Sequence, residues 1–200
     1  MVLSQALLGA VVSSGVADPP TWYVGIASHD FAGSETSLTL TSTGDGGTGD
    51  FSQYMDLEIV SYTRFSSGGA ASGTLIVEPN GDTYDGSNYQ TQRLNGNGSS
   101  SAGIGWAGYI IVEMEAPGST STANTFGAGV AQLFDINSGK WKQALGSSAG
   151  DLDGSGDVGF MTATWKDTGA ITSLKFRGTG DQTFAAGSRI DVFGVKRATA

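Results

Sequence analysis

ITSLKFRGTGDQTFAAGSRIDVFGVKR (171–197), near the end of the chain, carries the pattern that decides the fold. On both sides of a glycine-rich break, polar residues alternate with the apolar residues Leu174, Phe176, Ile190 and Val192. A period of two is typical of a strand that has one face in a core and the other in water. We therefore expect two strands here, and we expect the last one to pair beside an early strand and hold the C-terminus to the body.

The same alternation recurs along the chain, and helical periodicity is almost absent. It is seen in the segments 22–26, 38–40, 57–59, 75–77, 110–114 and 161–165. Turns rich in Gly, Ser and Asn separate these segments, and no stretch suits a helical crossover. The pattern predicts an all-β fold: an antiparallel jelly-roll β-sandwich of roughly 8–10 strands. We expect residues 21–200 to form this domain, with residues 1–20 as an N-terminal arm or a first strand.

Two predicted strands lose their alternation partway. The apolar positions shift by one after Ile59 and again after Val192. A single displaced position predicts a β-bulge, which bends a strand and suits the corner of a jelly roll.

Composition excludes several classes of function. The 200 residues can bury a core as one domain, and 32 Gly with only 14% charged residues favour short strands joined by turns. The absence of Cys excludes disulfides and thiolate metal sites. A net charge of −9 would be repelled by phosphate backbones, so we expect no nucleic-acid partner.

The N-terminal stretch MVLSQALLGAVVSSGVADPP (1–20) is apolar and contains no Lys or Arg. It is too short to cross a membrane, so we expect no membrane partner. The simpler interpretation is a first strand, and the alternative is an arm that docks on a neighbouring molecule. For the arm, the candidate contact residues are Val2, Leu3, Leu7, Leu8 and Val11.

Few residues suit catalysis. His29 is the only histidine, and we expect it in a loop because it stands next to Asp30 before a turn. Glu113 and Glu115 lie two apart in a predicted strand, so their backbones are roughly 6.5–7 Å apart, a separation that glycosidase carboxylates can span. Because the residues between them should face the core, we expect both glutamates in solvent or at a subunit contact. We expect no enzyme.

The segment DLDGSGD (151–157) resembles the opening of an EF-hand calcium loop. Its twelfth position is Thr162 and not the bidentate Glu, which excludes a true EF-hand. We expect no cofactor, with a weaker Ca²⁺ loop as the alternative to a hairpin turn that caps its own backbone. The candidate ligands are Asp151, Asp153, Ser155 and Asp157.

Aromatic residues near predicted loops can stack on sugars, although a β-sandwich also needs aromatics in its core. The aromatic candidates for binding are Tyr84, Tyr89 and Trp106. Asn88, Asn95 and Asn97 could add amide groups at the same end of the sandwich.

A further pattern lies in the order of seven motifs from about Thr36 to the end. They are YTRFSS (62–67), NGDTYDGSNY (80–89), LNGNGSS (94–100), TANTFGAGV (122–130), DGSGDVGF (153–160), AITSLKF (170–176) and AAGSRIDVFGVK (185–196). This order resembles that of small jelly-roll virion structural proteins of tailed bacteriophages, especially marine ones. Phe193 stands where a Tyr is common, and residues 1–20 have no counterpart in the resemblance.

The resemblance implies a structural or adhesive module on the outer surface of a phage particle, with no catalytic residues to carry over. The preferred expectation is a capsid (head) decoration protein that stabilises the shell and contacts the major capsid protein or other virion proteins. We expect a symmetric homo-oligomer, with a trimer as the first expectation. The alternative is a tail fibre or receptor-binding tip whose loops bind host glycans.

Overall fold

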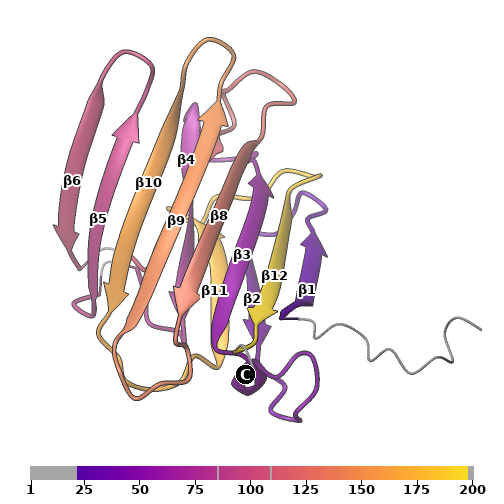
Figure 1. The fold of residues 1–200 in the computed structure, drawn as a ribbon. Helices are drawn as coiled ribbons and strands as arrows, with labels where there is room; N and C mark the ends of the chain where they lie inside the picture. Colours follow the sequence, from indigo (N-terminus) through magenta and orange to yellow (C-terminus); the bar gives the residue numbers. More distant parts are fainter. Residues whose placement is uncertain (1–21, 85, 109, 198–200) are drawn as a thin grey trace, which may run out of the picture.

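The computed structural model describes residues 22–84, 86–108 and 110–197. Two antiparallel sheets pack face to face, as Figure 1 shows. The strands are β1 (Tyr23–Asp30), β2 (Ser37–Thr41), β3 (Asp56–Thr63), β4 (Ser72–Pro79), β5 (Tyr89–Gly96), β6 (Ser101–Ala107), β7 (Val112–Pro117), β8 (Gly127–Phe134), β9 (Lys142–Asp151), β10 (Gly156–Trp165), β11 (Ser173–Gly178) and β12 (Arg189–Val195). A single 3-10 turn, η1 (Phe51–Gln53), precedes β3.

The strand order is that of a jelly roll with two insertions. The larger sheet has the order β1-β12-β3-β8-β9-β10-β5-β6, and the smaller has the order β2-β11-β4-β7. Without the hairpins β5–β6 and β9–β10, each sheet has four strands, and the chain crosses to the other sheet after every strand except between β4 and β7, which pair with each other. The two hairpins lie side by side and extend the larger sheet beyond the smaller one (Figure 1).

The predicted β-sandwich is confirmed, but the strand number is higher than expected. Among the described residues there are twelve strands, and β5, β6, β8 and β9 had no counterpart among the expected ones. The sequences of β6, β8 and β9 are rich in Gly, Ala and Ser, and β5 (YQTQRLNG) is mostly polar. The small side chains let β7 approach closely: a Cβ at Gly129 would stand 2.5 Å from Met114 Sδ, and one at Gly127 would stand 2.5 Å from Glu115 O.

The core lies between the sheets and consists of the inward side chains of both. Its largest fully buried members include Trp165, Tyr89, Phe65, Phe176 and Phe184. Burying a large apolar side chain contributes about 1.5–3 kcal/mol, so this layer dominates the stability of the fold.

The last strand pairs beside early strands of the larger sheet, as predicted. β12 pairs with β1 on one side and with β3 on the other. The predicted bulges in β3 and β12 are wrong, because the register between these strands is regular. The apolar Val60 and Tyr62 instead belong to the outward face of β3. The irregularity lies in β1, between Gly25 and Ala27.

Candidate functional site

One part of the outward surface of the larger sheet, on strands β8, β9, β10 and β5, carries no charged side chain except Asp151 at the tip of β9. These neighbouring strands alternate between inward and outward positions. We call the outward set the neutral face: Ala128, Val130, Gln132, Gln143, Leu145, Ser147, Ala149, Val158, Phe160, Thr162, Thr164, Gln90, Gln92 and Leu94. Charges border this face: Asp151 is at the tip of β9, Glu58 of β3 lies opposite Gln132, and Asp56 Oδ2 accepts a hydrogen bond from Gln132 Nε2 at 2.9 Å.

An apolar row crosses the neutral face at right angles to the strands. Register places Val130 opposite Ser147, Ser147 opposite Phe160, and Phe160 opposite Leu94. Phe160 is 53% exposed and Leu94 is 60% exposed. Large apolar side chains that lie together in solvent mark a surface that binds something.

Two shallow hollows lie on this surface. One, of about 330 Å³, is bordered by Val130, Ala149 and Val158 together with Val60 of β3. The other, of about 440 Å³, lies over the opposite ends of the strands and is lined by Gln90, Gln92, Gln143, Thr162, Thr164 and Trp106 among others. The face therefore has an apolar end and an end rich in amides and hydroxyls.

The outward face of the smaller sheet is different, because it carries ion pairs. Arg177 Nη2 lies 2.7 Å from Glu78 Oε1, and Lys175 Nζ lies 3.8 Å from the other oxygen of the same carboxylate. Burial raises the pKa of Glu78, but its hydrogen bonds and the cations lower it more, so the net shift is downward. The larger sheet also has outward charges, such as Glu58 of β3 and the Arg189–Asp191 pair of β12, but these lie outside the neutral face.

The two glutamates of β7 correct the sequence-based expectation. Glu113 and Glu115 lie neither in solvent nor at a free surface, because the larger sheet curls past β7 and Arg93 of β5 reaches both carboxylates. Arg93 Nη1 lies 2.6 Å from Glu113 Oε1, and Nη2 lies 3.2 Å from Asp157 Oδ2 while also bonding Glu115. The Arg93 side chain is only 10% exposed, so this is a buried ionic cluster.

The acid–base state of the cluster reflects its burial. Desolvation raises the pKa of Glu113 and Glu115, and the attraction of Arg93 offsets the shift only in part. Three carboxylates share one guanidinium, and Glu113 Oε2 and Asp157 Oδ1 are buried without hydrogen-bond partners. Glu113 and Glu115 therefore retain protons to higher pH than isolated glutamates would.

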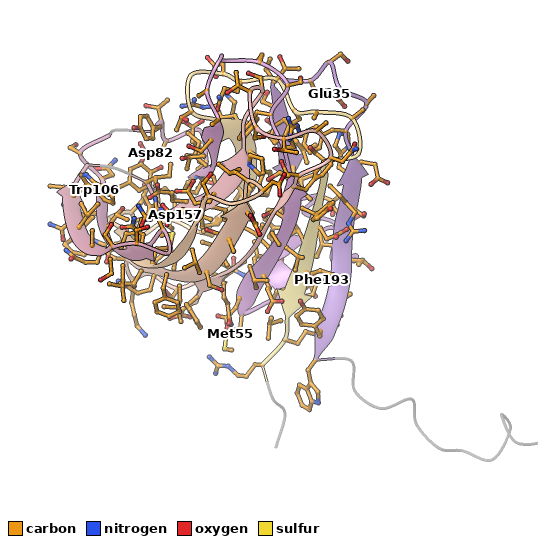
Figure 2. The ribbon with its side chains drawn as sticks, turned by 90° about the horizontal axis from the view of Figure 1, so that it is seen from above. Glu35, Met55, Asp82, Trp106, Asp157 and Phe193 are labelled. Atoms are coloured by element: carbon orange, nitrogen blue, oxygen red, sulfur yellow. The ribbon has the colours of Figure 1, made fainter. Side chains whose placement is uncertain are left out.

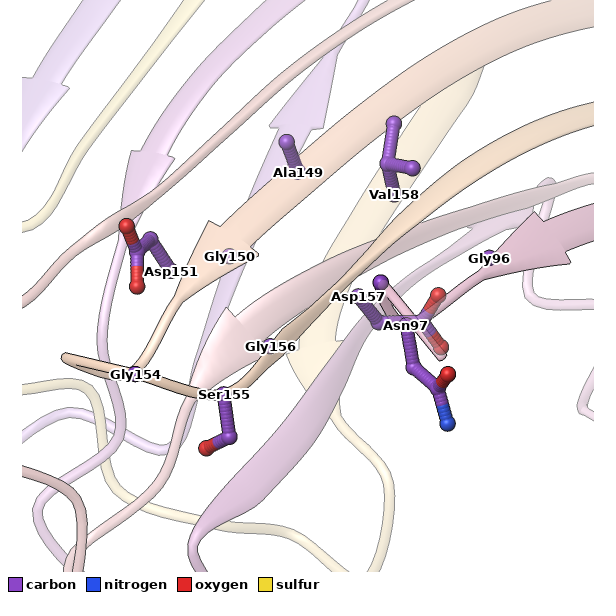
Figure 3. Close-up of a pocket in the computed structure, with 11 residues that line it drawn as sticks. Gly96, Asn97, Ala149, Gly150, Asp151, Gly154, Ser155, Gly156, Asp157 and Val158 are labelled. Carbon is purple, nitrogen blue, oxygen red and sulfur yellow. The ribbon is translucent and has the colours of Figure 1, made fainter. Parts of the chain in front are cut away.

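The segment 151–157 contains the end of β9, the tight turn at residues 152–155 and the start of β10. Asp153 and Gly154 both have positive φ, 67° and 96°, as in a type I′ hairpin turn. Asp151 Oδ1 accepts a hydrogen bond from Asp153 N at 2.9 Å. Figure 3 shows that Asp151, Ser155 and Asp157 point in different directions.

The proposed calcium ligands therefore do not converge in this conformation. Asp157 turns to Arg93 and Asn95. Within the described ranges, no group of three or more acidic or imidazole side chains is placed to hold a metal ion. Calcium binding by this loop, the alternative interpretation of the sequence, stays an untested hypothesis.

The three aromatic candidates do not form one site. Tyr89 is fully buried and its hydroxyl donates to Asp82 O, so it is not available for stacking on a sugar. Tyr84 is half-buried, and its ring lies 5.9 Å from the Arg177 guanidinium carbon. Trp106 is half-buried on β6 and lies at one end of the curved larger sheet (Figure 2).

Other expected residues have different outcomes. Val2, Leu3, Leu7, Leu8 and Val11 lie outside the described residues. His29 is in β1 and not in a loop, and its Nε2 lies 3.1 Å from Glu35 Oε1. No helix in the described part of the chain could span a membrane.

The neutral face was missed by sequence reasoning, although a signal for it exists. The stretches 94–112, 116–134, 143–150 and 158–165 contain no charged residue in a chain of net charge −9. Three of these stretches supply strands of the neutral face, and the first supplies the end of β5 and all of β6. Because Gly-rich segments of these stretches were predicted to be turns, the alternation of inward and outward side chains in them was not recognised.

No protein-family model and no curated protein matches the sequence.

Proposed function

We propose that this chain is a non-catalytic structural protein on the outside of a bacteriophage particle, where it binds the shell through the neutral face. The specific role that we propose is head decoration, with symmetric copies bound to the major capsid protein. The observation that carries this proposal is the neutral face itself. In a chain with net charge −9, Asp151 at the tip of β9 is the one charged side chain among the outward positions of these four adjacent strands.

The physical argument is desolvation. The cores of protein interfaces are depleted of charged residues, because removing a charge from water costs more than an apolar contact returns. Leu94 of β5 and Phe160 and Val158 of β10 lie on adjacent strands. Moving these apolar side chains out of water carries no desolvation penalty of the kind that a charge has. Shell stabilisation then follows by mass action, since a protein that binds only the closed shell must be released before the shell opens.

Binding to isolated phage heads tests the proposal. Wild-type protein should bind heads that lack it and raise their disruption temperature. Phe160→Asp should weaken binding by about tenfold or more, because it brings a charge into the buried centre of the contact. Thr39→Asp is the matched control, because it adds the same charge at an exposed position on the outward face of the smaller sheet. Equal binding of the two variants, or no binding of wild type to heads, would contradict the proposal.

A tail-fibre or receptor-binding role is the second candidate, and the amide-rich hollow of about 440 Å³ favours it. Gln90, Gln92 and Gln143 offer planar donors and acceptors of the kind that bind sugar hydroxyls. Binding to a glycan array that is lost in Gln92→Ala, without binding to heads, would support this role instead.

A further inference from the structure

The two edges of the larger sheet are protected to different degrees. At one edge, β1 has an irregular register between Gly25 and Ala27 and ends with Asp30. At the other edge, β6 has the sequence SAGIGWA, with no charge and no proline, and its register with β5 is regular along its whole length. Bulges, charges and prolines are the usual means by which natural proteins block pairing at a sheet edge. β6 has none of them.

The backbone of β6 presents hydrogen-bonding groups outward. The bonds Asn97 N to Ser100 O, 3.1 Å, and Gly108 N to Tyr89 O, 2.7 Å, set the phase of the β5–β6 ladder. Residues opposite each other in an antiparallel pair alternate between bonded and non-bonded pairs. By this phase, even-numbered residues of β6 bond to β5. The N–H and C=O groups of Ser101, Gly103, Gly105 and Ala107 therefore point away from the sheet.

We propose that β6 pairs with β6 of a second copy of this chain, antiparallel across a two-fold axis at Ile104. This register uses the entire strand and provides about eight backbone hydrogen bonds. It places Gly103 opposite Gly105 of the other copy. This inference does not depend on what the neutral face binds.

The side chains fit this register. Ala102 lies opposite Trp106 of the second copy, so a small residue meets a large one at both ends of the contact, and Ile104 meets its own equivalent at the axis. Such cross-strand apolar pairs stabilise sheets. Neither strand brings a charge to the contact, and the one cation of β5, Arg93, is already neutralised by the carboxylates of its cluster.

A second copy also extends a surface already described. Pairing at β6 continues the larger sheet, so the neutral faces of the two copies lie on one side of a joined sheet. Strand pairing alone buries less than the roughly 800 Å² per partner of a standard stable interface, so we expect dissociation in the micromolar range. A contact with a two-fold axis favours a dimer over the trimer expected from the sequence.

The test is the mass of the full chain in solution over a concentration series, by sedimentation. Gly103→Pro removes an outward N–H without removing a bond to β5, and proline is tolerated at such edge positions. Gly103→Ala is the matched control: it keeps the N–H, and no atom lies within 4 Å of the Cβ it would add. We expect wild type and Gly103→Ala to reach the mass of two chains, and Gly103→Pro to need at least about tenfold more protein to do so.

A second variant covers the case in which the proline disturbs the fold. Ile104→Asp places two carboxylates at the axis and should also prevent association, while circular dichroism confirms the strand content of each variant. A wild type that stays monomeric, a mass of three chains, or a dimer unaffected by Gly103→Pro and Ile104→Asp overturns the proposal. Association that is lost instead in Leu7→Asp/Leu8→Asp would assign the contact to the N-terminal segment, which also overturns it.

Discussion

Replacing Arg93 with methionine leaves Glu113, Glu115 and Asp157 without their shared cation. The methionine keeps most of the apolar stem, so the change removes charge more than volume. Removing one member of a buried ion pair costs about 3–5 kcal/mol, because it leaves an uncompensated buried charge. Since Arg93 is only 10% exposed and bonds all three carboxylates, we expect a loss of this size in the free energy of unfolding at pH 8.

The same loss should shrink as the pH falls. Burial already raises the pKa of Glu113 and Glu115 above the unfolded values, and losing Arg93 raises both further. Between the unfolded and the folded pKa, the native state holds more protons than the unfolded state, so stability falls as the pH rises through this window. The destabilisation is therefore smallest near the unfolded pKa of about 4.3 and complete above the folded pKa.

Urea unfolding at pH 5 and pH 8, followed by tryptophan fluorescence, measures both effects. Arg189→Met is the control, because Arg189 is about half exposed and its pair with Asp191 on the surface should contribute less than about 1 kcal/mol at either pH. Adding Glu113→Gln and Glu115→Gln to Arg93→Met should recover much of the loss at pH 8. A loss below about 1 kcal/mol at pH 8, or an equal loss at both pH values, would refute the reasoning.

Three further predictions concern other parts of the fold. Gly194→Ala should lower the free energy of unfolding by about 1–3 kcal/mol in denaturant titration, because its Cβ would stand 2.3 Å from the Tyr54 ring; an unchanged midpoint would contradict this. Lys142→Met should cost about 1–3 kcal/mol in the same assay, because the buried ammonium donates to backbone carbonyls that would lose their partner, and a neutral result would show that water replaces it. Native mass spectrometry with and without a chelator tests the 151–157 loop: we expect no shift, and a gain of ~40 Da per chain would establish a calcium site.

Sequence patterning predicted the jelly-roll body well where strands bury branched or aromatic side chains on one face. Leu174 and Phe176 of β11 and Ile190 and Val192 of β12 are fully buried or nearly so, as their alternation indicated. Strands β8 and β9 were hidden because their inward positions, apart from Leu133 and Lys142, are Ala, Gly and Ser. Those positions are small because β7 packs close to them, and this contact depends on residues far away in the sequence.

The candidate site was less accessible to prediction for a related reason. One-sided burial is the assumption behind the alternation rule, and β7 is covered on both faces. Glu113 and Glu115 were therefore assigned to solvent, although Arg93 lies 20 and 22 residues earlier in the sequence and returns to them through the inserted hairpin. The neutral face depends on which strands are neighbours in the sheet, and local patterns do not contain that order.

The two inserted hairpins and the eight jelly-roll strands contribute to different parts of the molecule. The eight strands of the jelly roll supply most of the core residues, and the segments 89–107 and 142–165 supply most of the residues of the neutral face. A designer can therefore vary the outward side chains of these hairpins, provided that the inward Tyr89, Ala144 and Trp165, which belong to the core, are kept. A cation must also be kept at position 93 of the β5–β6 hairpin, because it pairs with the buried Glu113 and Glu115 of β7.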